Sequence, residues 1–288
     1  MKCLKAFAIL VMIIFLSACN KDTVFKVVEC RQEMQVPVVT PEGVDHDEEL
    51  LEKRIAEITK NRRENWSVYL NVPLTGFTLE INNRQVVAAS EIKLFNMATL
   101  FNEMKNGDVA IDDKLELYLH KMITISSNDA SNEVVKAIGG GDFFKGANLV
   151  TEFANKLGCT DTKEQHMLFD VATATSGRNV TSVKDCGQLL NKIYFKNCVS
   201  PELDEQMLEL LKQQTRRAKI PAGVPNGVVV ANKTGENSKV EFDAAIVFSP
   251  NCDYILCICA TDLKGVDVYG TFNEISSTVY EFFNPEEI

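Results

Sequence analysis

Three short groups of residues in this sequence have the types and spacing that acyl transfer by a serine requires. Ser90 and Lys93 match Ser-x-x-Lys, residues 126–128 match Ser-x-Asn, and residues 233–235 read Lys-Thr-Gly. Serine is a weak nucleophile until a base takes its proton. Lys93 follows Ser90 by one helical turn, so the two side chains are predicted on one helix face, where the lysine can act as that base.

A lysine accepts a proton only when its amine is partly neutral. Burial or a nearby positive charge lowers the pKa of a lysine, and Lys233 is the candidate for that charge. Ser90 is predicted at a helix N-terminus, where its backbone N–H and that of Glu236 can stabilise an oxyanion. Ser126 can pass a proton to the departing nitrogen. Ser90, Lys93, Ser126 and the backbone of Glu236 form the predicted catalytic set.

The remaining motif residues are predicted to bind substrate. Asn128 can hold an amide, and Lys233 with Thr234 can bind a carboxylate through charge-assisted hydrogen bonds. Gly235 belongs to the same predicted strand. Each motif alone also has a plain structural explanation, such as a helix cap or a solvated surface charge. The occurrence of all three motifs in this order favours the catalytic interpretation.

The motifs and their flanks resemble the class A-like branch of the serine β-lactamase and penicillin-binding protein superfamily. The matching flanks are Ala88 to Ser90, Ser126 to Asn132 and Ala231 to Glu236. The resemblance covers residues 47–284. It implies a serine hydrolase that opens β-lactam rings through an acyl-enzyme on Ser90.

The sequence departs from that family where the acyl-enzyme is hydrolysed. Class A enzymes use a glutamate in a Glu-x-x-Leu-Asn motif, which this sequence lacks. Aligning residues 162–163 with the family's loop puts Leu168 near the glutamate position, and Glu164 is a substitute candidate four residues away. Ser127 also replaces the aspartate of Ser-Asp-Asn. We therefore expect acylation of Ser90 with slow deacylation, and Glu164 or no residue as the deacylation base.

Three functions compete at this point. The first is a β-lactamase-like hydrolase. The second is a D,D-peptidase, or penicillin-binding protein, that acts on D-Ala-D-Ala termini of cell-wall peptides. The third is a catalytically quiet lipoprotein that binds wall peptides or a protein partner through the same cleft. Retention of every motif side chain counts against the third.

The elements that position these motifs are predicted from hydrophobic periodicity. A helix begins near Asp47, and another through Phe272 and Val279 closes the chain. Five strands are predicted, over residues 66–72, 77–81, 227–231, 240–248 and 253–260. The last three are apolar at successive positions, so helices should cover both faces of their sheet. Cys257 and Cys259 should lie on one face of the last strand as small core residues.

A long helical stretch separates the two groups of strands. Residues 139–141 are glycines that should end one helix, and Asp142 can cap the next. This order predicts an α+β fold, an α/β sandwich in which helices flank an antiparallel sheet of about five strands. We predict one domain over residues 45–288. Its α/β lobe comprises 45–89 and 220–288, and an inserted all-helical lobe comprises 90–219.

The N-terminal residues have the form of a signal peptide. Lysines precede an apolar run over residues 6–16, and small residues follow it. The sequence Leu-Ser-Ala-Cys that ends at Cys19 resembles the lipobox of bacterial lipoproteins, which implies that Cys19 carries lipid. We predict a signal peptide over 1–18, a lipidated tether over 19–44 and an extracytoplasmic protein anchored to the membrane.

The composition is typical of a folded protein and excludes several partners. Of the 288 residues 45% are hydrophobic and 24% are charged, and the net charge is −10. Nucleic-acid binding needs a basic face, but the largest basic cluster is Arg216-Arg217 with Lys212 and Lys219 nearby. Three histidines and no Cys-x-x-Cys pair give zinc no ligand set. We expect a monomer without cofactor or metal that takes a β-lactam or D-Ala-D-Ala-like substrate.

Overall fold

The computed structural model describes residues 48–60, 62–169 and 177–285. The predicted signal peptide, the lipidation site Cys19, the tether and the helix start at Asp47 lie outside these residues. Within them, no helix is both long and apolar enough to cross a bilayer.

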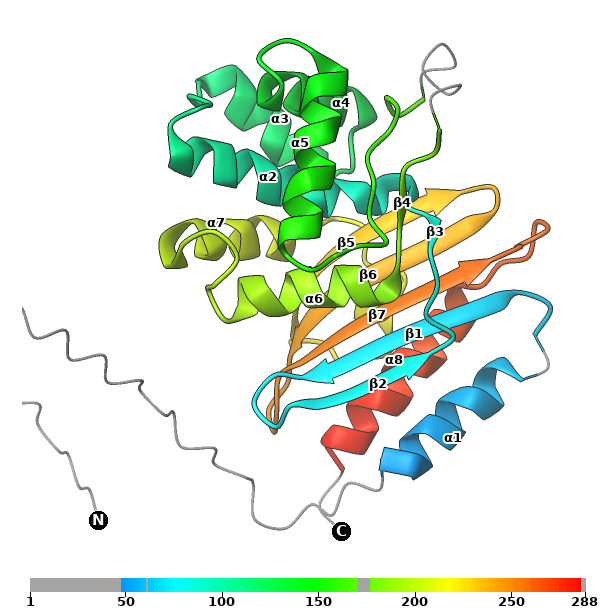
Figure 1. Ribbon diagram of the computed structural model, residues 1–288. Helices are drawn as coiled ribbons and strands as arrows, with labels where there is room; N and C mark the ends of the chain where they lie inside the picture. Colours follow the sequence, from blue (N-terminus) through cyan, green and yellow to red (C-terminus); the bar gives the residue numbers. More distant parts are fainter. Residues whose placement is uncertain (1–47, 61, 170–176, 286–288) are drawn as a thin grey trace, which may run out of the picture. The chain divides into compact units, whose positions relative to one another are not determined.

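A five-stranded antiparallel sheet lies at the centre of the described part (Figure 1). Its strands are β1 (Asn65–Val72), β2 (Phe77–Ile81), β5 (Val229–Asn237), β6 (Val240–Phe248) and β7 (Tyr254–Thr261). They are ordered β2-β1-β7-β6-β5, so strands from both ends of the domain meet where β1 pairs with β7. The predicted α+β class, with its sheet of about five antiparallel strands, is confirmed.

β5 continues beyond the apolar run that indicates it, through the Lys-Thr-Gly motif predicted on the same strand. The apolar pattern ends at Ala231, but β5 continues to Asn237, which pairs with Val240 at the start of β6. Hydrophobic periodicity does not detect a strand through the polar residues after Ala231, because it relies on apolar side chains. Backbone pairing with β6 does not depend on the side chains being apolar. The Lys-Thr-Gly motif therefore lies inside an edge strand and not at its end.

Helices cover both faces of the sheet. Helices α1 (Glu48–Thr59) and α8 (Tyr269–Phe283) pack on one face, and α6 (Val183–Tyr194) packs on the other (Figure 1). Side chains along β7 alternate between the two cores: Leu256 lies in the core under α1 and α8, and Cys257 lies in the opposite core. The predicted double-sided burial of the sheet is confirmed.

Most of the other helices form a lobe on the α6 side of the sheet (Figure 1). They are α2 (Lys93–Asn106), α3 (Asp113–Thr124), α4 (Asn128–Ile138), α5 (Phe143–Lys156) and α7 (Pro201–Lys212). α4 ends before the glycines at 139–141, and Asp142 caps α5 by accepting from two backbone N–H groups, as predicted. The stretch predicted as the helical lobe also contains α6, which contacts the sheet.

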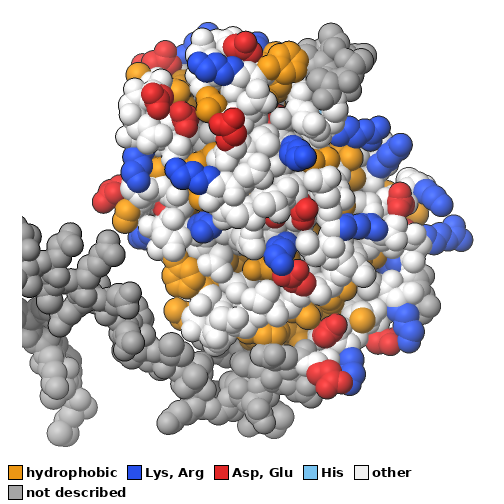
Figure 2. Space-filling model, in the orientation of Figure 1, with side chains coloured by type: hydrophobic (Ala, Val, Ile, Leu, Met, Phe, Trp, Pro, Cys, Tyr) orange, Lys and Arg blue, Asp and Glu red, His pale blue; other side chains and the backbone are white. Residues whose placement is uncertain are grey.

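Four short elements lie between these helices and strands. The 3-10 turn η1 (Ala89–Ile92) runs directly into α2 and contacts β5, and η3 (Ile220–Gly223) contacts α8. Strands β3 (Val86–Val87) and β4 (Val180–Thr181) pair just before η1 and α6. On the face that Figure 2 shows, positive and negative side chains both occur across the surface of the domain.

Candidate active site

The nucleophile candidate lies on a strained turn. Ser90 is in η1, and Ala89 before it has a φ of +48°, a left-handed conformation that is uncommon for a residue with a Cβ. Because η1 continues into α2, Lys93 comes one turn later on the same face. Its Nζ donates a hydrogen bond to Ser90 Oγ at 2.8 Å.

The turn between α3 and α4 supplies the other partners of Lys93. Its Nζ lies 2.6 Å from Ser126 O, 3.2 Å from Ser126 Oγ and 2.6 Å from Asn128 Oδ1. Ser126 has a φ of +62°, which turns the chain before α4. Ser127 accepts a hydrogen bond from Ala130 N and caps α4, so a serine serves where the family has aspartate.

Lys93 has the electrostatic environment that a general base needs. Its side chain is fully buried, and burial together with the positive charge of Lys233 lowers its pKa to about 6. Burial is the larger of the two causes. Burial also lowers the pKa of Lys233 to about 8, against the effect of the Glu91 carboxyl. At neutral pH, Lys93 is then largely a free amine while Lys233 keeps its charge.

β5 brings the Lys-Thr-Gly motif against this group. Lys233 Nζ donates to Ser126 Oγ at 2.9 Å and to Thr234 O at 2.5 Å. Thr234 Oγ1 is buried and has no hydrogen-bond partner among the described residues. A Cβ on Gly235 would lie 2.9 Å from Ala88 O and 2.9 Å from Glu91 N, so only glycine lets β5 pack directly on the nucleophile turn.

A cavity of about 150 Å³ adjoins the nucleophile, and both Ser90 and Glu236 line it. β5 is the edge strand, so alternate backbone N–H groups along it are not used in pairing with β6. The Glu236 carboxylate is held by Arg216 Nη1 at 2.6 Å and faces Lys219 Nζ at 3.4 Å. The sequence shows these two basic residues as a cluster but gives no sign that they surround the Lys-Thr-Gly strand.

The loop from Thr162 to Leu168 forms the opposite wall. Leu168 lines the cavity, and its backbone N–H and C=O are both hydrogen-bonded to the Asn132 side chain, at 2.9 and 3.1 Å. An apolar side chain therefore lies at this wall, and it belongs to the residue that the sequence alignment places near the family's deacylating glutamate.

Glu164 lies behind this wall. Its side chain is buried, it does not line the cavity, and its Oε1 accepts from Asn179 Nδ2 at 3.1 Å. Burial raises its pKa to about 8, so it is mostly protonated at neutral pH and cannot act there as a base.

Asn179 holds this loop in place. Its Oδ1 accepts from the backbone N–H groups of Gln165 and His166, and its Nδ2 also donates to His166 O. The sequence places Asn179 in a run of turn formers, which predicts an ordinary loop. Its role depends on contacts fourteen residues away in the chain, for which the sequence carries no signal.

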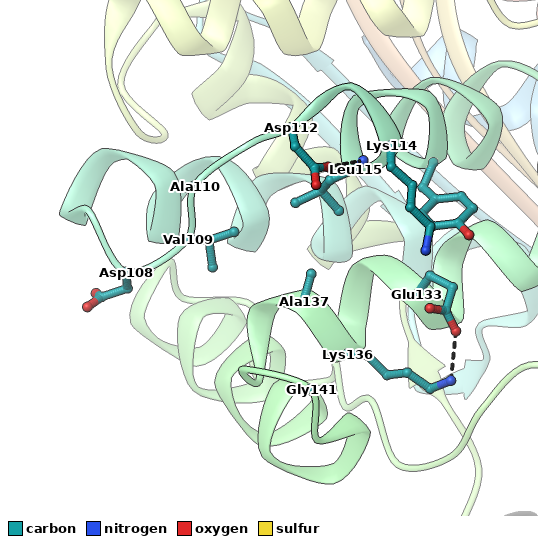
Figure 3. Close-up of a pocket in the computed structure, with 11 residues that line it drawn as sticks. Asp108, Val109, Ala110, Asp112, Lys114, Leu115, Glu133, Lys136, Ala137 and Gly141 are labelled. Atoms are coloured by element: carbon teal, nitrogen blue, oxygen red, sulfur yellow. Dashed lines mark hydrogen bonds and ion pairs between the residues drawn. The ribbon is translucent and has the colours of Figure 1, made fainter.

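A larger cavity, of about 530 Å³, lies on the helical lobe around α3 and α4 (Figure 3). Charged side chains that include Asp112 and Lys114 line it, and Lys136 pairs with Glu133 at its edge. None of the motif residues lines this cavity, so the chemistry belongs to the smaller one. Within the described part of the chain, no group of three or more potential ligand side chains could hold a metal ion.

A model of the beta-lactamase enzyme family matches residues 50–283 of this sequence. The chain belongs to the beta-lactamase enzyme family. The predicted superfamily is thereby confirmed, and so is the general class of a β-lactamase-family serine hydrolase fold.

Solved structures with a similar fold include PBP-A and several beta-lactamases. PBP-A superposes with a TM-score of 0.73 at 22% identity, and the match covers 82% of this chain and 96% of PBP-A. A beta-lactamase from Sphaerobacter thermophilus gives 0.73 at 18% identity, covering 83% and 98%. The TLA-1 extended spectrum beta-lactamase gives 0.73 at 18%, covering 81% and 98%. At these identities the likeness shows the fold alone.

In this family fold, the structure brings together the side chains that the sequence singled out. Ser90, Lys93, Ser126, Asn128 and Lys233 form one continuous hydrogen-bonded group. Thr234 and Gly235 follow on β5, and Glu236 meets Ser90 at the cavity. Glu164 is not part of this group.

Proposed function

We propose that this protein is a serine hydrolase that opens β-lactam rings through an acyl-enzyme on Ser90 and releases the acyl group slowly. The observation that carries the proposal is the 2.8 Å hydrogen bond between Lys93 Nζ and Ser90 Oγ, made by a lysine whose pKa is lowered to about 6. A free amine at that distance can take the serine proton as the oxygen attacks.

The chemical step uses groups already in contact. Ser90 Oγ bonds to the lactam carbonyl carbon and gives its proton to Lys93 Nζ, and the carbonyl oxygen becomes an oxyanion. Backbone N–H groups of Ser90 and Glu236 stabilise that charge. When the lactam C–N bond breaks, Ser126 gives its hydroxyl proton to the nitrogen and is reprotonated from Lys93, 3.2 Å away. Lys233 beside Ser126 Oγ binds the substrate carboxylate.

Slow deacylation follows from the wall opposite Ser90. Hydrolysis of the acyl-enzyme ester needs a base that activates water. Such a base accelerates a reaction by about 10²- to 10⁴-fold. Leu168 cannot supply one, and Glu164 is buried away from the cavity and protonated at neutral pH. The acyl-enzyme therefore persists.

The lack of a deacylating base at this wall also supports a second function, that of a D,D-peptidase that acts on D-Ala-D-Ala termini. Such an enzyme uses the same acylation groups and retains β-lactams as long-lived adducts. A point mutant of PBP-A, which matches this chain at 21% identity, is described as an acyl-enzyme complex with penicillin G. A catalytically quiet binding protein is disfavoured, because burying two lysines against Ser90 and Ser126 brings a desolvation penalty with no benefit to binding alone.

Mass spectrometry after incubation with penicillin G tests the acylation. We expect a shift by the whole mass of the drug, located on Ser90, that decays slowly, and no shift in Ser90→Ala. An unaltered protein that never gains mass would refute the proposal. Comparing nitrocefin hydrolysis with D-alanine release from a model peptide then separates the β-lactamase from the D,D-peptidase.

We also propose that the protein acts outside the cytoplasm, anchored through a lipid on Cys19, on the strength of the signal-like run and the lipobox that precedes Cys19. Mass spectrometry of the mature N-terminus tests this. An N-terminal peptide that begins at an acylated Cys19 is expected, and an unmodified Cys19 would contradict it.

A further inference from the structure

A polar cavity of about 580 Å³ lies where α1 ends and β1 begins, at an edge of the domain (Figure 1). Among the described residues that line it, Lys60, Arg62 and Arg84 are cations and Glu64 is the one carboxylate. Lys and Arg side chains gather along this same edge in Figure 2. The net charge of the chain is −10, so the basic lining runs against the charge of the whole molecule. The cavity volume is typical of small-molecule sites, which measure about 300 to 1,000 Å³.

The charge of Arg84 makes this cavity attractive to an anion. Its Nη2 donates to the hydroxyl of Thr261 at 2.6 Å, and it forms no ion pair with any described residue. The other two cations, Lys60 and Arg62, belong to exposed ion pairs at 2.8 and 3.6 Å. Exposed pairs stabilise a fold little, so their cations can exchange partners readily. A guanidinium binds a carboxylate or a phosphate through two parallel hydrogen bonds.

Uncharged polar groups in the same lining suit a ligand with several hydroxyl groups. Asn82 Nδ2 donates to Trp66 O at 3.3 Å, and among the described residues Asn82 Oδ1 is an unused acceptor. Asn83 Oδ1 accepts from Lys184 N at 3.1 Å, which leaves its Nδ2 as a donor. The Glu64 carboxylate adds a further acceptor. A hydroxyl both donates and accepts, so it can use each of these groups.

Trp66 provides an independent sign of a ligand. Its side chain is 3% exposed and forms part of the cavity lining. The indole Nε1 is buried and has no hydrogen-bond partner among the described residues. Buried donors are almost always paired, and an unpaired one is costly. An oxygen of a bound ligand would satisfy this N–H.

We propose that this cavity binds an acidic saccharide, a sugar that carries one carboxylate or phosphate group. Arg84, with Lys60 and Arg62, binds the anionic group, and Asn82 and Asn83 bind hydroxyl groups. None of the motif residues lines this cavity, so the inference does not depend on the proposed acylation.

Titration calorimetry with three ligands of one sugar scaffold tests the site. Glucose, glucuronate and glucose 6-phosphate differ at one carbon only. We expect at least one of the two anionic sugars to bind about tenfold more tightly than glucose, or more, because charge-assisted hydrogen bonds contribute that much. The tighter of the two identifies the anionic group. Equal affinities for all three, or no binding of any, would overturn the site.

Simple anions separate the sugar from its charge. Acetate and inorganic phosphate should bind more weakly than the sugar that carries the same group. If they bind as tightly, the cavity takes anions in general, and the saccharide proposal is wrong.

Substitutions at the cavity and beside it provide matched variants. Arg84→Gln should lower the affinity for the acidic sugar to nearly that for glucose, and Arg84→Lys should keep part of the difference. Arg63 is exposed next to Arg62 but does not line the cavity, so Arg63→Gln should leave the affinity unchanged. An affinity in Arg84→Gln equal to that of the unaltered protein would contradict the proposal.

Fluorescence locates the bound sugar. Trp66 is the only tryptophan of the chain, so its emission should change as the sugar contacts the indole, with the midpoint that calorimetry gives. Ser90→Ala should bind the sugar equally well, and a failure of acylation leaves this test intact. Binding in the calorimeter without any change in emission would place the sugar elsewhere and overturn the site.

Discussion

Two buried lysines with lowered pKa values determine how acylation depends on pH. Lys93 takes the proton only as a free amine, which predominates above its pKa of about 6. Lys233 binds a carboxylate only as an ammonium, which predominates below its pKa of about 8. We expect the second-order rate constant for penicillin to rise with pH through about 6 and to fall through about 8. A rate constant that stays flat across both values, in protein that circular dichroism shows to be folded, would contradict these roles.

Glu91, between the nucleophile and the base, is an unusual buried acid. Its side chain is fully buried, and neither carboxyl oxygen has a hydrogen-bond partner among the described residues. Burial raises its pKa well above the usual 4.5, although the charge of Lys233 opposes this. The folded protein thus keeps a proton that the unfolded chain releases, so the free energy of unfolding falls as pH rises above about 4.5.

Glu91→Gln should remove this loss of stability. The variant should gain free energy of unfolding at neutral pH, and much less near pH 4, where both states of the unaltered protein are mostly protonated. Urea unfolding at the two pH values measures the difference. A gain that is the same at both values would mean that packing, and not the charge, is responsible.

The motif residues could be predicted from the sequence because acyl transfer demands fixed residue types at fixed spacings. Ser90 and Lys93 must share a helical turn, and the sequence shows that they do. Glu91 and Asn179 could not be predicted in the same way. Glu91 occupies a position that the motif leaves free, and Asn179 acts on a loop that only the folded chain brings next to it.

At the scale of elements, the loop from Thr162 to Leu168 decides what happens after acylation. The Asn132 side chain on α4 binds the backbone of this loop at Leu168, and the Asn179 side chain binds it at Gln165. This double attachment holds an apolar side chain over the cavity. The sequence already placed Leu168 near the position of the missing glutamate, because the family resemblance aligns the loop as well as the motifs.

Leu168→Glu tests the contribution of this loop. A carboxylate at the cavity wall can take a proton from water and so activate it toward the acyl carbon. We expect deacylation to become about tenfold faster or more, while the acylation rate changes little. The lifetime of the penicillin adduct, followed by mass spectrometry, measures this.

Two further variants control that experiment. Leu168→Gln has nearly the shape of the glutamate without its charge and should retain the slow release. Glu164→Gln should also leave the adduct lifetime unchanged, because Glu164 does not line the cavity. A lengthened lifetime in Glu164→Gln would instead assign the deacylation step to Glu164.

Elements were predicted well where burial imposes a pattern and poorly where it does not. The strands over 240–248 and 254–261 are mostly apolar, and their bounds were predicted within a residue. The polar half of β5 carries no such pattern. α6 has an apolar face like its neighbours in the sequence, and nothing in that periodicity shows that the face packs on the sheet and not on other helices.

At the scale of the whole domain, the two lobes share one core. The larger hydrophobic cluster contains Leu119 from α3 and Phe242 from β6, so it runs from the helical lobe into the sheet. The smaller cluster, on the other face of the sheet, contains Trp66. β7 contributes to both clusters through alternate residues. Neither lobe can unfold without exposing apolar surface of the other, which favours a single cooperative transition.

The one tryptophan of the chain makes this testable. Trp66 packs edge-to-face on Phe272 of α8, on the sheet face away from the helical lobe, so its fluorescence reports the α/β lobe. Circular dichroism reports the helices, most of which belong to the helical lobe. Urea should unfold both signals at one midpoint. Leu119→Ala leaves a cavity in the helical lobe, which should lower the free energy of unfolding by about 2–5 kcal/mol. Both midpoints should fall equally. If the helical signal moves while the Trp66 signal stays, the lobes unfold independently, and the shared core does not couple them.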